Sequence, residues 1–163
     1  TVKKVESSKE FKDLKKDLKG LFLSDGFILV EKQNYDSGDY GEWQVDYFEP
    51  DSGCMFSFTT TKGKISVQKS TDIVKSEEQV HKLNLDKLKV GFNSILDEAE
   101  NLRNKKYQNE KPYKIIIVIQ NKHKKDIWNI TYLTSSFKTL NLKIDAETGE
   151  TIEESLKPLI SFG

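Results

Sequence analysis

The side chains that could do chemistry are few and widely separated in this chain. There are two histidines, His81 and His123, and neither lies near Cys54 or at metal-ligand spacing from the other. Zinc sites are usually built from closely spaced cysteine and histidine ligands, so we expect no metal and no other cofactor. Ser135 and Ser136 are adjacent, but the glycine pattern and nearby base that would activate a serine nucleophile do not accompany them.

The carboxylates that cluster in the sequence do not indicate acid–base catalysis either. Asp97, Glu98 and Glu100 fall within a predicted helix, and Glu153 and Glu154 lie near the end of the chain. At such positions we expect exposed side chains, whereas a catalytic acid and base need a site that shifts their pKa values. The chemistry therefore favours a non-enzymatic protein that acts by binding.

Two loops that precede similar strands carry opposite charges. The charged residues are Asp36, Asp39 and Glu42 in the first loop and Lys122, His123, Lys124 and Lys125 in the second. We expect these positions to bind a protein partner or a second copy of the chain, because a surface with two oppositely charged ends suits head-to-tail association. The alternative is nucleic-acid binding through residues 122–125 and the first helix, which requires these lysines to share one face.

The overall charge argues against nucleic acid and membranes as partners. The 163 residues include 26 basic and 26 acidic side chains, so no global field attracts an anionic polymer or lipid surface. All the basic residues except Arg103 are lysines, which disfavours recognition by the two-pronged guanidinium group.

Cysteine content and hydropathy bear on the location. Cys54 is the single cysteine, which excludes an intramolecular disulfide and fits a reducing compartment. No apolar run approaches the roughly 20 residues that span a bilayer, and no apolar signal core follows residues 1–4. We expect a cytoplasmic protein, or an exported or anchored one if a signal precedes Thr1 in the natural chain. Cys54 alternates with Phe56 and Phe58, so we expect it to be buried.

Apolar periodicity predicts helices over about 8–19 and 86–104 and strands between them. The first strand is expected over 27–33, after a turn at 24–26, and residues 71–85 read as a polar linker. The run Ile115–Ile119 is apolar at every position, so we expect both its faces to be covered. Short turns join the remaining strands, which indicates an antiparallel sheet and an α+β fold.

The order of sequence patterns indicates an internal duplication. The stretch Trp43–Phe48 is echoed by Trp128–Leu133, and apolar runs, hairpins and a preceding helix follow the same order in both halves. We predict two α-β-β-β-β repeats, at 1–70 and 86–163, joined by the linker at 71–85; the two could share one sheet. Equal spacing also predicts that Trp43 matches Trp128 and that Tyr47 matches Tyr132 on equivalent sheet faces.

The second half resembles the PepSY domain, a small module with a helix and an antiparallel sheet. The residues that carry the resemblance are Trp128–Tyr132 and Leu142–Glu150, which ends in the turn Asp-Ala-Glu-Thr-Gly-Glu. The first half is similar only through Trp43, Tyr47 and Gly63. The resemblance implies a binding or inhibitory module that acts on a peptidase or an envelope partner.

A different class of function stays open. Curved α+β domains often hold a pocket between helix and sheet, so the chain could instead be a small-molecule-binding or catalytic domain. A cavity with converging polar groups would favour that alternative, and a closed apolar core would disfavour it.

Overall fold

The computed structural model describes residues 1–71 and 79–159. The helical segments are α1 (Val2–Ser7), α2 (Lys9–Asp17), α3 (Lys32–Asp36), the 3-10 turn η1 (Leu85–Lys87) and α4 (Phe92–Lys106). The strands are β1 (Phe22–Glu31), β2 (Gln44–Glu49), β3 (Cys54–Thr61), β4 (Lys64–Ser70), β5 (Pro112–Lys122), β6 (Lys125–Thr134), β7 (Lys138–Asp145) and β8 (Thr151–Pro158).

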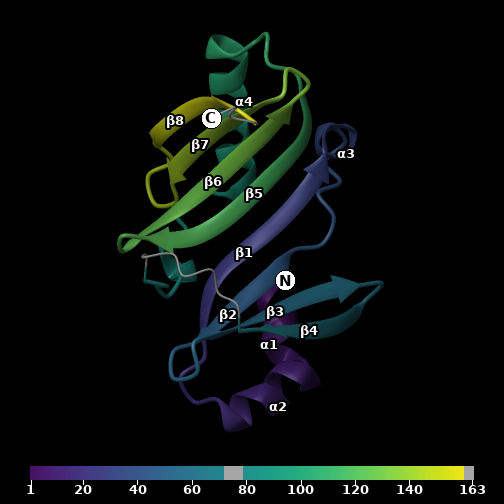
Figure 1. Ribbon diagram of the computed structural model, residues 1–163, viewed down its shortest axis with the longest axis vertical. Coiled ribbons are helices and arrows are strands. Elements are labelled where there is room, and N and C mark those ends of the chain that lie inside the picture. Colours follow the sequence, from purple (N-terminus) through teal and green to yellow (C-terminus); the bar gives the residue numbers. More distant parts are fainter. Residues whose placement is uncertain (72–78, 160–163) are drawn as a thin grey trace.

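All eight strands form one antiparallel sheet in the order β4-β3-β2-β1-β5-β6-β7-β8, which confirms the predicted α+β class (Figure 1). Strands β1 and β5 pair at the centre, and each half adds three antiparallel strands outward, with α3 in the connection from β1 to β2. The two halves therefore share one continuous sheet instead of folding as separate ones. In the part of the chain that the structure describes, no helix is long and apolar enough to cross a membrane.

The cross-strand partners of the two halves correspond. Tyr47 lies opposite Phe56, and Tyr132 lies opposite Leu140. Both tyrosines are buried on the sheet face that carries the helices. An internal duplication remains a prediction, although a helical segment followed by four strands does occur twice in the element order.

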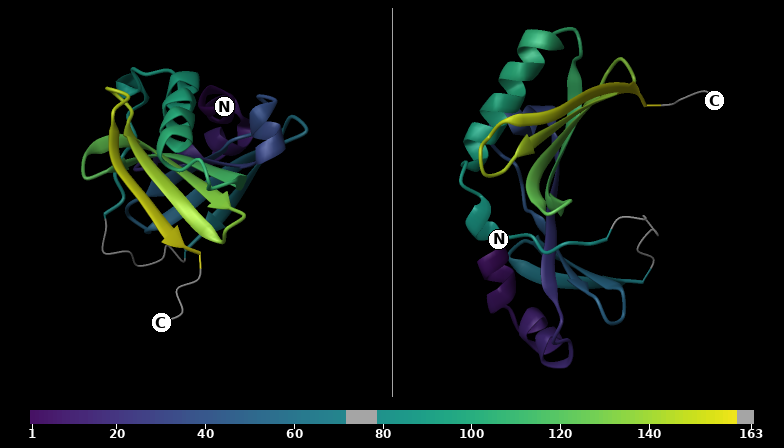
Figure 2. Two further views of the ribbon diagram at one scale, coloured as in Figure 1. Left: turned by 90° about the horizontal axis from the view of Figure 1, so that it is seen from above. Right: turned by 90° about the vertical axis from the view of Figure 1, so that its left-hand side faces the viewer.

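The helices pack on one face of the sheet, and the other face curves away from them as a concavity (Figure 2). Helix α2 contributes Phe11, whose ring lies 4.7 Å from that of Tyr47 and 5.6 Å from that of Phe58. Helix α4 buries Ile95, Leu96 and Ala99. Apolar residues three and four apart on a helix lie on one side, which explains why α4 buries these positions.

Several element boundaries differ from the predictions. The expected turn at 24–26 lies inside β1, which starts at Phe22 because a bulge after Leu23 keeps the strand paired through these small residues. Gln33 belongs to α3 and not to the first strand. The second long helix begins at Phe92, six residues later than expected, and α2 ends at Asp17.

The predicted linker is only partly described, because residues 72–78 lie outside the described residues. The end of the linker is integrated into the fold. Leu83 is buried, and its backbone N–H donates to the Leu23 carbonyl oxygen at 2.9 Å. Residues 83–85 thus pack against the sheet.

Candidate binding surface

The acidic loop forms local contacts at one end of the sheet. Asp36 lies in α3 and forms an ion pair with Lys32. The Asp39 carboxylate accepts a hydrogen bond from the Gly41 backbone N–H at 3.3 Å, and Glu42 is exposed. Such exposed pairs contribute about 0 to 1 kcal/mol to stability.

The basic loop is a tight two-residue turn between β5 and β6. His123 and Lys124 both have positive φ angles, of 50° and 66°, which is the conformation that such hairpin turns require. The Lys125 ammonium lies 3.9 Å from the Asp145 carboxylate. Acidic neighbours at 126, 145 and 147 surround Lys124 and Lys125, which does not favour nucleic-acid binding.

The two charged loops lie at opposite ends of the central strand pair. The acidic loop follows the end of β1, where Glu31 is paired with Lys114. The basic turn follows the end of β5, where Gln120 is paired with Asp25. The seven predicted residues therefore form two separate surfaces and not one combined site. The nucleic-acid alternative also needs helix α2, which packs near β4 at one edge of the sheet (Figure 1). The helix is therefore separated from the basic turn.

The concave face of the sheet is a candidate binding surface that the sequence did not predict. Its centre is apolar: Phe27 is paired with Val118, and Leu29 is paired with Ile116. These side chains alternate with the buried residues of β1 and β5, so they point away from the helices. Leu29 is 49% exposed. Ile115–Ile119 is thus covered on the helix side, while Ile116 and Val118 are only half-buried on the other.

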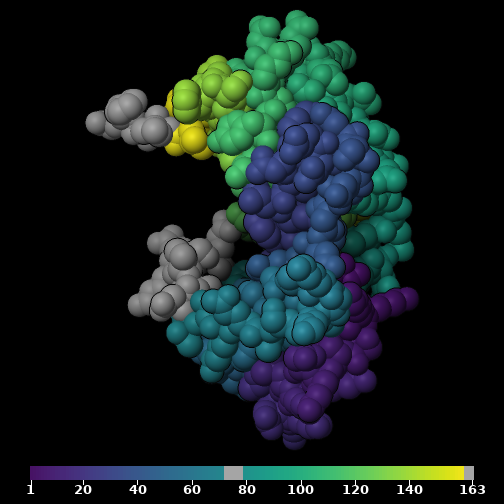
Figure 3. All heavy atoms as spheres, turned by 90° about the vertical axis from the view of Figure 1, so that its right-hand side faces the viewer, coloured from purple at the N-terminus to yellow at the C-terminus, as the bar shows by residue number. Residues whose placement is uncertain are grey.

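Polar side chains flank this apolar centre on β6 and β7. The Asn141 amide nitrogen lies 2.6 Å from the Asn129 side-chain oxygen and 2.7 Å from the Thr131 hydroxyl. On the other side, β2 places Gln44 on the concave face. Figure 3 shows the molecule hollowed between the outer strands of the two halves. We call this surface, from Gln44 across β1 and β5 to Asn141, the concave groove.

A cavity of about 390 Å³ adjoins the concave groove where β1 meets the basic turn. Asp25 lines it and is the cross-strand partner of Asp46. The Ser24 hydroxyl lies 2.7 Å from the Asp25 carboxylate, and the Gln44 amide donates to Asp46 at 3.0 Å. Lys122 and His123 line the same cavity, so two of the predicted residues do belong to a pocket.

The environment of Asp25 favours its neutral form. Burial raises the pKa of Asp25, the negative charge of Asp46 raises it further, and together they bring it to about 7. A carboxyl whose pKa lies near neutrality can gain or lose a proton in the physiological range. No sequence signal indicates this pair, because Asp25 falls in a predicted turn and Asp46 lies 21 positions away.

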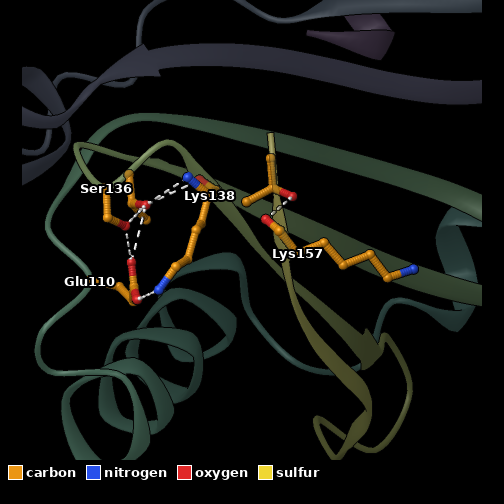
Figure 4. Close-up of polar contacts among 6 residues, drawn as sticks. Glu110, Ser136, Lys138 and Lys157 are labelled. Carbon is orange, nitrogen blue, oxygen red and sulfur yellow. Dashed lines mark hydrogen bonds and ion pairs between the residues drawn. The ribbon is translucent and has the colours of Figure 1, made fainter. Parts of the chain in front are cut away.

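A third polar cluster fixes the turn between β6 and β7 (Figure 4). Glu110 accepts hydrogen bonds from the hydroxyls of Ser136 and Thr134, and the Lys138 ammonium lies 2.7 Å from its other oxygen. Hydrogen bonds from Lys138 and Ser136 lower the pKa of Glu110. A charged carboxylate held by a lysine is a weak base, so this cluster suits a structural role better than activation of Ser136.

Two of the carboxylates that we expected to be exposed form ion pairs or hydrogen bonds with other side chains. Glu100 is half-buried and lies 2.9 Å from the guanidinium of Arg103, a buried residue of the same helix, α4. Glu154 accepts hydrogen bonds from Lys106 at 3.0 Å and from the Tyr107 hydroxyl at 3.1 Å. These contacts attach α4 to β8, which is a structural use of the acidic residues.

Comparisons with known proteins define the fold. No protein-family model matches the chain, and a search of curated proteins found no match. Among solved structures, the chain is similar to the crystal structure of a "putative lipoprotein" from Clostridium difficile 630, with a TM-score of 0.53 and 11% sequence identity. The match covers 91% of this chain and 90% of the other. At this identity, the likeness shows a similar fold over most of both chains and nothing about a shared role.

Proposed function

We propose that the protein is a non-enzymatic binding protein that holds an extended segment of a partner polypeptide in the concave groove. The observation that carries the proposal is the apolar centre of the groove. Leu29 and its neighbours on β1 and β5 form a contiguous apolar strip on a face that no described helix covers. Exposed apolar strips with polar rims are typical of interaction sites.

The width of the strip supports an extended chain as the occupant. In the two cross-strand rows that pass through Phe27 and Leu29, only β1 and β5 contribute apolar side chains, and neighbouring strands lie about 4.8 Å apart. The floor is therefore about one polypeptide wide. The amide and hydroxyl groups of Gln44, Asn129, Thr131 and Asn141 border it, and such groups can bond to the backbone of a bound segment.

Two expectations from the sequence bear on the proposal. The resemblance to PepSY domains implies a protein partner, which agrees with a peptide-binding groove. The expected cytoplasmic location changes, because the structural neighbour is described as a "putative lipoprotein", and this supports the alternative of an exported or membrane-attached protein. Self-association through the two charged loops stays a separate prediction.

A displayed library of linear peptides tests the groove. Selection on the wild-type protein should enrich peptides that carry apolar residues at alternate positions. Leu29→Asp should weaken their binding more than tenfold, because a charge replaces the centre of the strip. Val67→Asp is the matched control: Val67 is 40% exposed and, as the partner of Phe58, lies on the other face of the sheet.

Two results would overturn the proposal. One is a selection that enriches no peptide over the starting library. The other is enrichment of peptides that bind Leu29→Asp as tightly as the wild type, because such peptides would occupy another surface.

A further inference from the structure

A second cavity lies on the opposite side of the sheet from the concave groove. It has a volume of about 190 Å³ and lies between β1, β2, β5 and β6 and the segment that carries Leu83 and Leu85. Its walls are mainly apolar, with Leu23, Val45, Ile119 and the two tryptophans among the residues that line it. Asp25 is the lining residue with an ionisable side chain. Its position in the strand directs this side chain towards the concave face.

Tryptophan rings make one wall of this cavity. Trp43 and Trp128 meet at 6.1 Å between ring centroids, and Phe92 packs against both rings at 5.6 Å and 5.4 Å. Trp128 is 6% exposed, and its indole N–H has no hydrogen-bond partner among the described residues. The aromatic wall is thus fixed by its own packing.

Gly26 allows Ile119 and Trp43 to pack closely against β1. A Cβ atom at this position would lie 3.1 Å from the Ile119 side chain and 3.5 Å from the Trp43 ring. Any larger residue would press against the wall of the cavity. The absence of a side chain on β1 therefore allows Trp43 to lie close to the strand.

The cavity is large enough for a ligand and opens at its rim. An apolar cavity of about 150 Å³ in a protein interior stays dry and binds benzene. At about 190 Å³, this one has room for a molecule with one ring and a short substituent. Leu85 lines it and is 42% exposed, so solvent reaches its edge.

We propose that this cavity binds a small, uncharged molecule built on a single aromatic or aliphatic ring. The volume sets the size of the ligand, the apolar walls exclude a charged group, and the tryptophan faces provide ring contacts. This site is independent of the concave groove, because the two lie on opposite faces of the sheet.

Toluene is the probe, and size-matched benzoate is the charged comparison. The chain contains only two tryptophans, and both line the cavity, so their two indole N–H resonances report directly on occupancy. We expect toluene to shift both resonances in a saturable manner and to move the tryptophan emission. Benzoate should shift both signals far less than toluene, because the lining residues other than Thr1 and Asp25 are apolar.

Two exposed leucines provide a matched pair of variants. Leu85→Glu places a charge at the rim and should weaken toluene binding about fivefold or more. Leu159→Glu changes a similarly exposed residue that follows β8 at the outer edge of the sheet and should leave binding unchanged. Because both positions are exposed, thermal melts should show that both variants fold.

The proposal fails if toluene causes no saturable shift, since the cavity would then be a packing void. It also fails if benzoate produces the same shifts or if Leu85→Glu binds toluene like the wild type. None of these outcomes bears on the concave groove, which the peptide selection tests separately.

Discussion

Replacing Asp25 with asparagine should remove a pH dependence from the stability of the protein. Burial and the neighbouring Asp46 raise the pKa of Asp25 from 3.8 to about 7. Between about pH 4 and pH 7 the folded protein keeps a proton on this carboxyl that the unfolded chain has lost. The stability that the proton provides is therefore complete below about pH 4 and is lost as the pH rises through 7.

The size of the effect can be worked out from the pKa. Each pH unit between the two pKa values changes the free energy of unfolding by about 1.4 kcal/mol. Over the two units from pH 5 to pH 7 this gives an upper limit of about 3 kcal/mol, and solvent screening of the partly exposed Asp25 carboxyl reduces it to about 2 kcal/mol. Asparagine imitates the neutral acid and keeps the Ser24 and Asp46 contacts, so Asp25→Asn should escape this loss.

Urea unfolding at pH 5, 6, 7 and 8 measures the effect. The free energy of unfolding of Asp25→Asn should exceed that of the wild type by an amount that grows by about 2 kcal/mol between pH 5 and pH 8. Asp51→Asn is the control, because Asp51 is exposed and its replacement should leave the pH profile unchanged. A constant difference between Asp25→Asn and the wild type at all four pH values would show that Asp25 titrates normally, and the reasoning about its environment would be wrong.

Three further predictions concern packing and the basic turn. Trp128→Ala should lower the free energy of unfolding by about 3 to 5 kcal/mol in urea titrations, the usual loss for a buried aromatic; an unchanged transition would contradict its place in the core. Replacing His123-Lys124 with Asn-Gly should raise stability by about 1 kcal/mol in a thermal melt, because both positions have positive φ angles, and a lower melting temperature would mean that the present side chains stabilise the turn. Reversing Lys122, Lys124 and Lys125 to glutamate should leave the melt nearly unchanged but weaken association at low salt, as measured by light scattering; indifference to the reversal would remove the basic turn from the candidate surfaces.

The sequence predicted the fold class well because its strongest signals are local. The spacing of Ile95 and Ala99, one helical turn apart, predicted a helix in the region of α4. Short hairpin turns predicted the antiparallel pairing of the second half. The first half was predicted less well. Asp25 and Gly26 are typical turn residues, and only pairing with both β2 and β5 holds them in a strand. The partner strands are distant in the sequence, so no local sequence pattern predicts this pairing.

The candidate sites were harder to predict, since each is formed by residues that are distant in the sequence. The carboxyl pair joins Asp25 to Asp46 across two strands, and the tryptophan wall joins Trp43 to Trp128 across the two halves. Charge was the most visible feature of the loops, and it located the basic turn beside cavities, yet it located neither the carboxyl pair nor the tryptophan wall. Exposed charged loops are common on all proteins and therefore discriminate poorly.

One local signal in the sequence does point to the concave groove. In an antiparallel sheet with one covered face, apolar and polar residues should alternate along each strand. Residues 115–119 are apolar at every position, which predicts cover on both faces, and the described structure supplies that cover on one face only. The apolar side chains of Ile116 and Val118 are therefore not needed by the helix-side core. A partner that covers Ile116 and Val118 would explain why the run is apolar at every position. These two uncovered side chains are therefore the basis of the peptide-binding proposal.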